Sequence, residues 1–312
     1  MDRIGDWLAV FPPQMREPVL FAIPFFLLLL IIEWTAARKL EHLEDSLDRG
    51  VDPDQVPSGA YFARDAWTSI SMGLVSIATL GLWKFLALIG YAALYAYVAP
   101  WHLSPSKWYT WVIAIVGVDV LFYAYHRTAH RVRLIWATHQ AHHSSRYFNF
   151  ATALRQKWNN TGEIIVWTPL PLLGIPPWMV FTSFSINLIY QFWIHTERIG
   201  TLPRPIEFVF NTPSHHRVHH GTDKLYIDRN YGGIFILWDR LFGSFQPEVF
   251  RPHYGLTTQV TTFNIWNLQT HEYASIARDV RRATRWRDRF GYAFGPPGWA
   301  PAEQRREPAP AA

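Results

Sequence analysis

Long apolar stretches separated by polar segments dominate the pattern of this chain. Residues 19–34 and 108–125 each come close to the roughly 20 apolar residues that a membrane-spanning helix needs. The stretch 66–99 is too long for one ordinary span, so it predicts either two closely apposed helices or one span with a tilted or re-entrant segment. Residues 163–194 are interrupted by "PLPLLGIPPW", whose prolines predict a break into two helices.

The polar segments predict how these helices are connected and oriented. Residues 40–65 contain "RGVDPDQVPSG" and indicate a loop, and no obvious further span follows the apolar region that ends at residue 194. The first apolar run has no small-residue cleavage site, which favours an uncleaved anchor helix. Arg38 and Lys39 follow that helix and favour the cytosolic side for its end.

Together these segments predict an all-α fold, an integral membrane helical bundle of about four to five membrane helices with a His-rich cytosolic cap. Residues 1–105 would form N-terminal membrane helices and a polar loop, and residues 106–262 the domain that carries the histidines. In residues 263–312, the basic segment "RRATRWRDR" should lie at the lipid surface and "PPGWAPAEQRREPAPAA" should form a disordered tail. The bacterial inner membrane and the endoplasmic reticulum both fit this organisation.

Composition supports a membrane protein and narrows the chemistry. Hydrophobic residues make up 49% of the chain and charged residues 17%, below the roughly 25% of ordinary globular domains. The net charge of +5 favours an anionic membrane surface over nucleic acid, because the basic residues flank apolar stretches and no nucleic-acid motif is found. The chain has no cysteine, so any metal must be bound by nitrogen and oxygen.

Histidines form the candidate site, because most of them occur in "HRTAH", "HQAHH" and "HHRVHH". Residues three and four apart share a helix face, and neutral imidazole is a good ligand for iron, copper and zinc. One such pair alone is more often a surface or packing feature, but three groups in under a hundred residues favour metal binding. Eight imidazoles exceed the four ligands of one structural zinc and would suit two ions. Iron fits best, because zinc cannot change its oxidation state to activate dioxygen.

These three motifs resemble the histidine boxes of the fatty acid hydroxylase/sterol desaturase superfamily. The connecting segments, including "TALRQ", "YQFWIHTE" and "IDRNYGGIFILWDRLFGSF", are similar to its alkylglycerol monooxygenase-like branch with bacterial members, and the likeness runs from about residue 119 to 262. The resemblance implies a membrane enzyme, a di-iron lipid monooxygenase or hydroxylase. Its co-substrate would be O2, and an external reductant, either tetrahydrobiopterin or a separate redox protein, would supply electrons. The implied catalytic iron ligands are His126, His130, His139, His142, His143, His216, His219 and His220.

Further residues are assigned to this site by the resemblance or by their spacing. His195 occupies the place of an extra iron ligand, and Gln191 one turn before it could be a weak ligand, a hydrogen-bond partner or a packing residue. His215 could orient the cluster, and Asp119 lies seven residues before His126 on the same helix face. Four more acidic residues are candidate partners of the imidazoles: Glu163, Glu197, Asp228 and Asp239.

Two local features leave alternatives open. Asp228 and Asn230 in "YIDRNYGG" could form a structural turn instead of contacting the site. Arg131 follows the first motif where the animal ether-lipid enzymes carry an acidic residue, which puts in doubt whether redox partner and substrate are shared.

Three functions are compatible with these features. The first is oxidation of a lipid C–H bond, with cleavage of an alkylglycerol ether as one outcome. The second is a sterol or fatty-acid desaturase or hydroxylase on the same scaffold. A non-catalytic membrane metal-binding or transport protein is the third, but it predicts ionisable residues spread through several spans, whereas here they cluster outside the spans.

Overall fold

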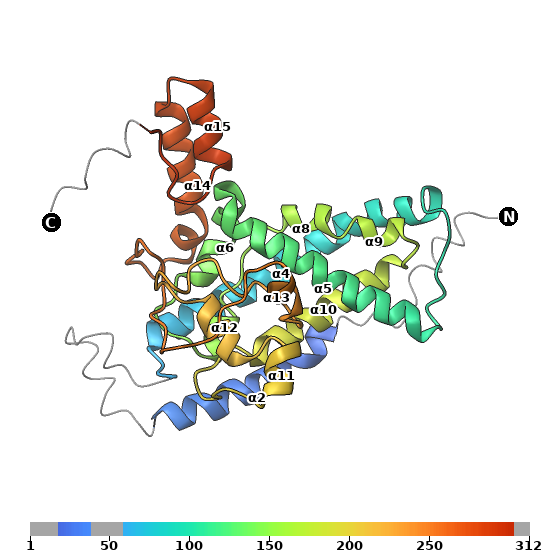
Figure 1. Ribbon diagram of the computed structural model, residues 1–312, viewed down its shortest axis with the longest axis horizontal. Coiled ribbons are helices and arrows are strands. Elements are labelled where there is room, and N and C mark those ends of the chain that lie inside the picture. Colours follow the sequence, from blue (N-terminus) through green and yellow to red (C-terminus); the bar gives the residue numbers. More distant parts are fainter. Residues whose placement is uncertain (1–17, 39–58, 303–312) are drawn as a thin grey trace.

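A computed structural model describes residues 18–38 and 59–302, apart from the side chains of residues 161, 163 and 164. Throughout these residues the fold is helical and contains no named strand, which confirms the predicted all-α class (Figure 1). The helices are α2 (Pro18–Arg38), α4 (Ala63–Tyr97), α5 (Trp108–Arg131), α6 (Arg133–His143), α7 (Phe150–Ala153), α8 (Thr161–Val166), α9 (Pro169–Leu172), α10 (Pro177–Trp193), α11 (Arg204–Val209), α12 (Pro213–His219), α13 (Leu237–Leu241), α14 (Ile265–Arg282) and α15 (Trp286–Phe294).

Within the described ranges, three helices are long and apolar enough to cross a membrane: α2, α4 and α5. This is fewer than the expected four to five. The expected break at the prolines is confirmed, but it gives three helices and not two: the short helices α8 and α9 and the 17-residue helix α10. Gly174 ends this break with a φ of +79°, and a Cβ there would lie 2.3 Å from the carbonyl oxygen of Trp101. A residue with a side chain would therefore collide with the turn before α5.

Helix α4 differs from one of the two predicted alternatives, because residues 63–97 form one continuous helix of 35 residues and not two apposed helices. At 1.5 Å per residue it is roughly 52 Å long, which exceeds the ~30 Å hydrocarbon core of a bilayer. The excess belongs to the cap, where Asp65, Ser69 and Met72 are buried against other segments. An apolar run longer than one span therefore arises here from a single helix that continues into the protein.

The centre of the bundle is the packing of α5 against α10 and α4. Ala114 and Val118 on α5 are fully buried, together with Met179 and Val180 on α10. In lipid the surrounding solvent is as apolar as these side chains, so their close packing, more than water exclusion, must hold the helices together. Helices α5 and α10 pack along each other, and both run toward the cap (Figure 1).

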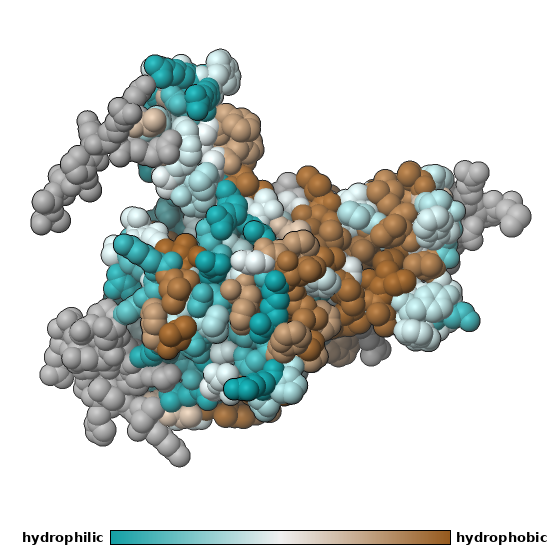
Figure 2. All heavy atoms as spheres, in the orientation of Figure 1, coloured by the Kyte–Doolittle hydropathy of each residue, from teal (hydrophilic) through white to brown (hydrophobic). Residues whose placement is uncertain are grey.

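The two ends of the long helices differ in character. Exposed aromatic residues surround the end away from the cap: Tyr97, Trp101, Trp108 and Tyr109. Such residues favour the membrane–water boundary. Figure 2 shows hydrophobic atoms along the long helices and mainly polar atoms over the cap. The molecule therefore presents one apolar belt between an aromatic end and a polar end.

Several predicted segments lie partly or wholly outside the described residues. The predicted loop falls on residues 39–58, which are outside the description, and on the start of α4. Residues 303–312 of the expected tail are also outside it. The first residues of that expected tail are ordered, because Trp299 packs against Tyr292 with ring centroids 5.2 Å apart.

Candidate metal centre

The histidine motifs all lie where helices enter the cap. "HRTAH" forms the last turns of α5, "HQAHH" ends α6, and "HHRVHH" occupies α12 and the residue after it. His195 follows the end of α10. Val132, in an extended conformation, is the only residue between α5 and α6, so the chain turns sharply and brings the first two motifs together. The eight histidines of these motifs other than His215, together with His195, are each at most 9% exposed.

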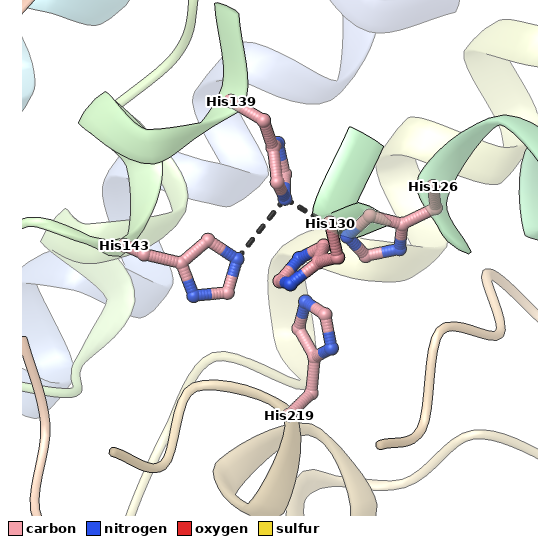
Figure 3. Close-up of side chains that lie close together, drawn as sticks. All are labelled: His126, His130, His139, His143 and His219. Atoms are coloured by element: carbon pink, nitrogen blue, oxygen red, sulfur yellow. Dashed lines mark hydrogen bonds between the residues drawn. The ribbon is translucent and has the colours of Figure 1, made fainter. Parts of the chain in front are cut away.

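Five of these imidazoles converge on one point and are named the five-imidazole group (Figure 3). Its members are His126, His130, His139, His143 and His219. One ring nitrogen of each lies within 4.8 Å of the corresponding nitrogen of every other member. The Nε2 atom of His139 lies 2.9 Å from Nε2 of His126 and 3.0 Å from Nε2 of His143.

The remaining four imidazoles form a second convergent set, the four-imidazole group. Its members are His142, His195, His216 and His220. Nε2 of His195 lies 3.2 Å from Nε2 of His142 and 2.9 Å from Nε2 of His216. The two groups adjoin, because the rings of His143 and His220 stack with centroids 4.3 Å apart.

Main-chain carbonyl groups determine which nitrogen faces each centre. The Nδ1 atoms of His126, His142, His195 and His219 lie 2.6–3.1 Å from the carbonyl oxygens of Tyr231, Arg155, Gln191 and Arg229, respectively. A carbonyl oxygen can only accept a hydrogen bond, so each Nδ1 carries the hydrogen. Each Nε2 therefore keeps its lone pair and directs it into the group.

This orientation allows a direct test of whether the groups fit a metal. His142 and His195 both donate Nδ1–H to carbonyls, so their Nε2 lone pairs face each other across 3.2 Å. The buried Nε2 atoms of His130 and His219 have no hydrogen-bond partner. Nitrogen lone pairs arranged in this way repel one another or remain without a partner. A cation placed among them would attract all of them. Ligands at about 2.1 Å from one ion would lie roughly 3.0–3.4 Å apart, as the closest pairs do.

For the imidazoles that do not belong to a membrane-spanning helix, burial favours the neutral form. It is the main cause that lowers the pKa of His139, His143 and His220 well below the usual value for histidine, and neighbouring imidazoles lower it further. For His195, burial lowers the pKa to about 4. Neutral imidazole is the form that binds metal, so both groups can accept an ion near neutral pH.

Asp119 is buried and acts on the site through a loop, without contacting an imidazole. Its carboxylate accepts hydrogen bonds from the main-chain N–H of Ile234 at 2.6 Å, from Trp238 Nε1 at 2.7 Å and from Asn187 Nδ2 at 2.7 Å. Ile234 lies three residues after Tyr231, whose carbonyl orients His126. Asp119 therefore holds the loop whose Tyr231 carbonyl orients His126, seven residues further along the same helix.

Gln191 and His215, the other two predicted neighbours of the site, belong to neither imidazole group. The side chain of Gln191 donates to Asn187, while its main-chain carbonyl accepts from His195. His215 places Nε2 2.9 Å from a carboxylate oxygen of Glu207 and is in neither imidazole group. Burial alone would raise the pKa of Glu207, but hydrogen bonds from His215, Leu202 and Ser214 lower it to about 2.

The other predicted acidic residues have distinct roles. Asp228 lies 3.7 Å from Nδ1 of His130 and 3.4 Å from Nε of Arg131, so it faces the site. Asn230 and Asp228 both have positive φ, and Asn230 bonds the main chain of His215 and Gln246, so the segment is also a structural turn.

Asp239 accepts hydrogen bonds from the main-chain N–H groups of Tyr231 and Gly232 and supports the same loop. Glu197 pairs with Arg251 and accepts a hydrogen bond from the N–H of Gly59. The side chain of Glu163 lies outside the described residues.

Three residues that sequence reasoning did not select also shape the site. Arg155 is 1% exposed, pairs with Asp65 on α4 and accepts from His142 through its carbonyl oxygen. Glu33 on α2 accepts hydrogen bonds from Tyr61, Thr196 and the N–H of Phe150, so it ties the first helix to the residue after His195. Its position in an apolar run was the available signal, since a carboxylate there needs partners. Phe148 stacks on His195 at 5.6 Å and covers the four-imidazole group.

Comparison with known proteins places this site in a family. Residues 111–244 match the family described as fatty acid hydroxylase. The chain is 37% identical to human alkylglycerol monooxygenase over 293 residues, 94% of this chain and 62% of that protein. It is 42% identical to alkylglycerol monooxygenase of Danio rerio over 217 residues, 67% of this chain and 48% of that protein. An ornithine lipid hydroxylase of Rhizobium tropici is 27% identical over 170 residues, 51% of this chain and 50% of that protein. No solved structure matches.

The matched segment contains all nine clustered histidines, and the class follows: the chain belongs to the fatty acid hydroxylase/sterol desaturase superfamily, as its motifs predicted. Within that class it is similar to human alkylglycerol monooxygenase over 94% of its own length and to that of Danio rerio over 67%. The chain spans 62% of the length of the human protein and 48% of the length of the Danio rerio protein.

Proposed function

We propose that this protein is a membrane di-iron monooxygenase that oxidises a C–H bond of a lipid, with an alkylglycerol ether as its substrate. The observation that carries the proposal is the pair of adjoining imidazole groups, in which lone pairs face one another without hydrogen-bond partners. The similarity to alkylglycerol monooxygenases supports the substrate class.

The proposed iron ligands are the nine residues of the two groups, five around one ion and four around the other. When bound, the two irons would activate O2 with two electrons from an external reductant. Oxidation of the carbon next to the ether oxygen inserts one oxygen atom there and reduces the other to water. The resulting hemiacetal collapses to a fatty aldehyde and glycerol.

The chain's own residues supply orientation and exclude water in this scheme. Carbonyl oxygens hold four imidazoles with Nε2 directed inward, and Phe148 shields the four-imidazole group. The site lies where the apolar belt meets the cap, so a lipid can bring its ether carbon to the metals while its alkyl chain stays in the bilayer (Figure 2). Arg38, Arg127 and Arg131 occupy the cap end of the helices, which supports a cytosolic cap and a cytosolic electron donor.

Lipid oxidation by purified protein tests this proposal. The protein loaded anaerobically with Fe²⁺ should consume O2 and release fatty aldehyde from an alkylglycerol when tetrahydrobiopterin, or a reduced redox protein, is supplied. The matched control is His142→Ala, which keeps the membrane helices but removes one member of the four-imidazole group. Protein that holds a single zinc ion and consumes no O2 with any lipid and reductant would disprove the proposal.

The second candidate is hydroxylation or desaturation of a sterol or an acyl chain on the same scaffold. The ornithine lipid hydroxylase relative and the Arg131 departure favour it. Comparing lipid extracts from cells with and without the active protein separates the two, because the first candidate depletes ether lipids and the second accumulates an oxidised sterol or acyl chain.

A further inference from the structure

The last two helices form a hairpin that projects from the cap, across the direction of the long helices (Figure 1). Helix α14 packs against α6, and α15 returns along α14. Because the long helices define the membrane normal, a projection across them extends along the plane of the bilayer surface. The hairpin therefore lies at the level of the cap, beside the apolar belt.

One face of α15 is aromatic and uncovered. Trp286, Phe290 and Phe294 are four residues apart, so they share a face of the helix, and they are 80%, 66% and 47% exposed. Figure 2 shows hydrophobic atoms on the side of the hairpin toward which the long helices extend, and polar atoms at its outer end. Aromatic side chains in this position would face lipid, not water.

Arginines border this aromatic face. Residues 278–289 contain six arginines and two aspartates, a net charge of +4 from six minus two. Arg281, Arg282, Arg285 and Arg287 are exposed. An amphipathic helix with aromatic residues on one face and arginines beside them matches the interface of an anionic bilayer. A soluble acidic partner would account for the charge but not for three large aromatic side chains exposed on one helix face beside it.

The hairpin is fixed to the metal centre through Arg133, the first residue of α6. Its guanidinium lies 2.7 Å from carboxylate oxygens of both Glu272 and Asp279 on α14, and its main-chain N–H donates to the carbonyl of Gly295. Helix α6 also carries His139, His142 and His143. A surface that holds the hairpin therefore also holds the helix that contributes to both imidazole groups.

We propose that this hairpin is an interfacial anchor, which binds anionic lipid headgroups through its arginines and inserts Trp286, Phe290 and Phe294 at the bilayer surface. It holds the cap flat against the membrane beside the long helices. The anchor is independent of iron and of the reaction, so it can be tested in metal-free protein.

The lack of native cysteine makes a site-specific test simple. Full-length Phe290→Cys protein carries a nitroxide label and is reconstituted into vesicles of phosphatidylcholine alone or mixed with anionic phosphatidylglycerol. We expect the label to become about fivefold less accessible to a water-soluble relaxation agent in the anionic vesicles, and more accessible to O2. A label at Ala277→Cys, an exposed position on α14 outside the aromatic face of α15, is the control and should change little.

A charge variant distinguishes lipid binding from a structural effect. Replacing Arg282, Arg285 and Arg287 by glutamine should remove the extra protection in anionic vesicles while the helix content stays unchanged. Equal accessibility at positions 290 and 277 in both vesicles would overturn the anchor. Protection that appears only after a soluble protein is added would overturn it too, in favour of a protein partner.

Discussion

At the residue scale, the decisive feature is that main-chain oxygens, not side chains, orient four of the nine imidazoles. Histidines presented through Nδ1–H to a carbonyl are fixed in one tautomer, with Nε2 as the free donor. His130 differs from these four, because its Nδ1 faces the carboxylate of Asp228, 3.7 Å away, and not a main-chain carbonyl. One imidazole therefore depends on a titratable partner, while four depend only on the path of the chain.

Removal of one ligand should separate the two groups. His142→Ala deletes a member of the four-imidazole group, and we expect iron content to fall from two toward one per chain and activity to fall by at least about 100-fold. The protein should still insert into membranes, because His142 lies outside the packed belt. Metal analysis and O2 uptake measure this, with His102→Ala, at the opposite end of the bundle, as the control. Unchanged activity in His142→Ala would remove it from the ligand set.

Glu207 should produce a measurable pH dependence of stability. Its pKa is held at about 2, below its ordinary value, so its carboxylate stabilises the folded state fully above the ordinary value of about 4.3. That contribution should disappear as the pH falls from about 4.3 toward 2. Glu207→Gln should lower the free energy of unfolding at pH 7 by about 1–3 kcal/mol, since glutamine keeps only one acceptor oxygen and either Ser214 or Leu202 loses its acceptor.

Thermal unfolding of both proteins at a series of pH values tests this. The two curves should differ at neutral pH and converge in acid. If they stay equally far apart at pH 3, the stabilisation does not come from the charge of Glu207.

At the element scale, the helices that carry the histidines were predictable and their supports were not. The apolar runs predicted α2 and α5, and the motif spacing predicted that the imidazoles share helix faces. Helix α4 was misjudged in part, since hydropathy alone does not distinguish an apolar residue facing lipid from one buried in the cap. The carbonyl groups of Tyr231, Arg155 and Arg229 leave no trace in residue type, because every residue has one. The division into five and four imidazoles also needed the tertiary structure.

The loop after "HHRVHH" is the element most sensitive to a distant substitution. Asp119→Ala removes the acceptor of two main-chain N–H groups and of the indole of Trp238, which should destabilise the fold by about 2–4 kcal/mol. We expect iron affinity of the five-imidazole group to fall about 10–100-fold, because the Tyr231 carbonyl loses its position.

Gly233→Ala provides an independent perturbation of the same contact, since a Cβ at Gly233 would lie 2.8 Å from the Asp119 carboxylate. Anaerobic iron titration of both variants measures the affinity. A normal affinity in both would show that the loop does not determine the position of His126.

At the scale of the whole molecule, the site lies at a boundary between two environments. The apolar belt of long helices extends to one side of it, while the cap brings α6, α12 and the loop after α12 together (Figure 1). Glu33 links the first helix to Thr196, and Arg133 links the last hairpin to α6, so both described ends of the chain are fastened to the same centre. Residues far apart in sequence thus determine one small volume.

The division of the imidazoles between the groups has a spectroscopic consequence. "HQAHH" gives His139 and His143 to one group and His142 to the other, while "HHRVHH" gives His216 and His220 to the second and His219 to the first. Each motif therefore gives its middle histidine to the group that holds the outer two histidines of the other motif. Helix α5 adds two imidazoles to the five-imidazole group, whereas His195 adds one to the four-imidazole group. Two irons held there would be chemically inequivalent, and the loaded protein should show two Mössbauer quadrupole doublets of equal area. The repeated motif builds a pair of sites that look alike in sequence and differ in electronic structure.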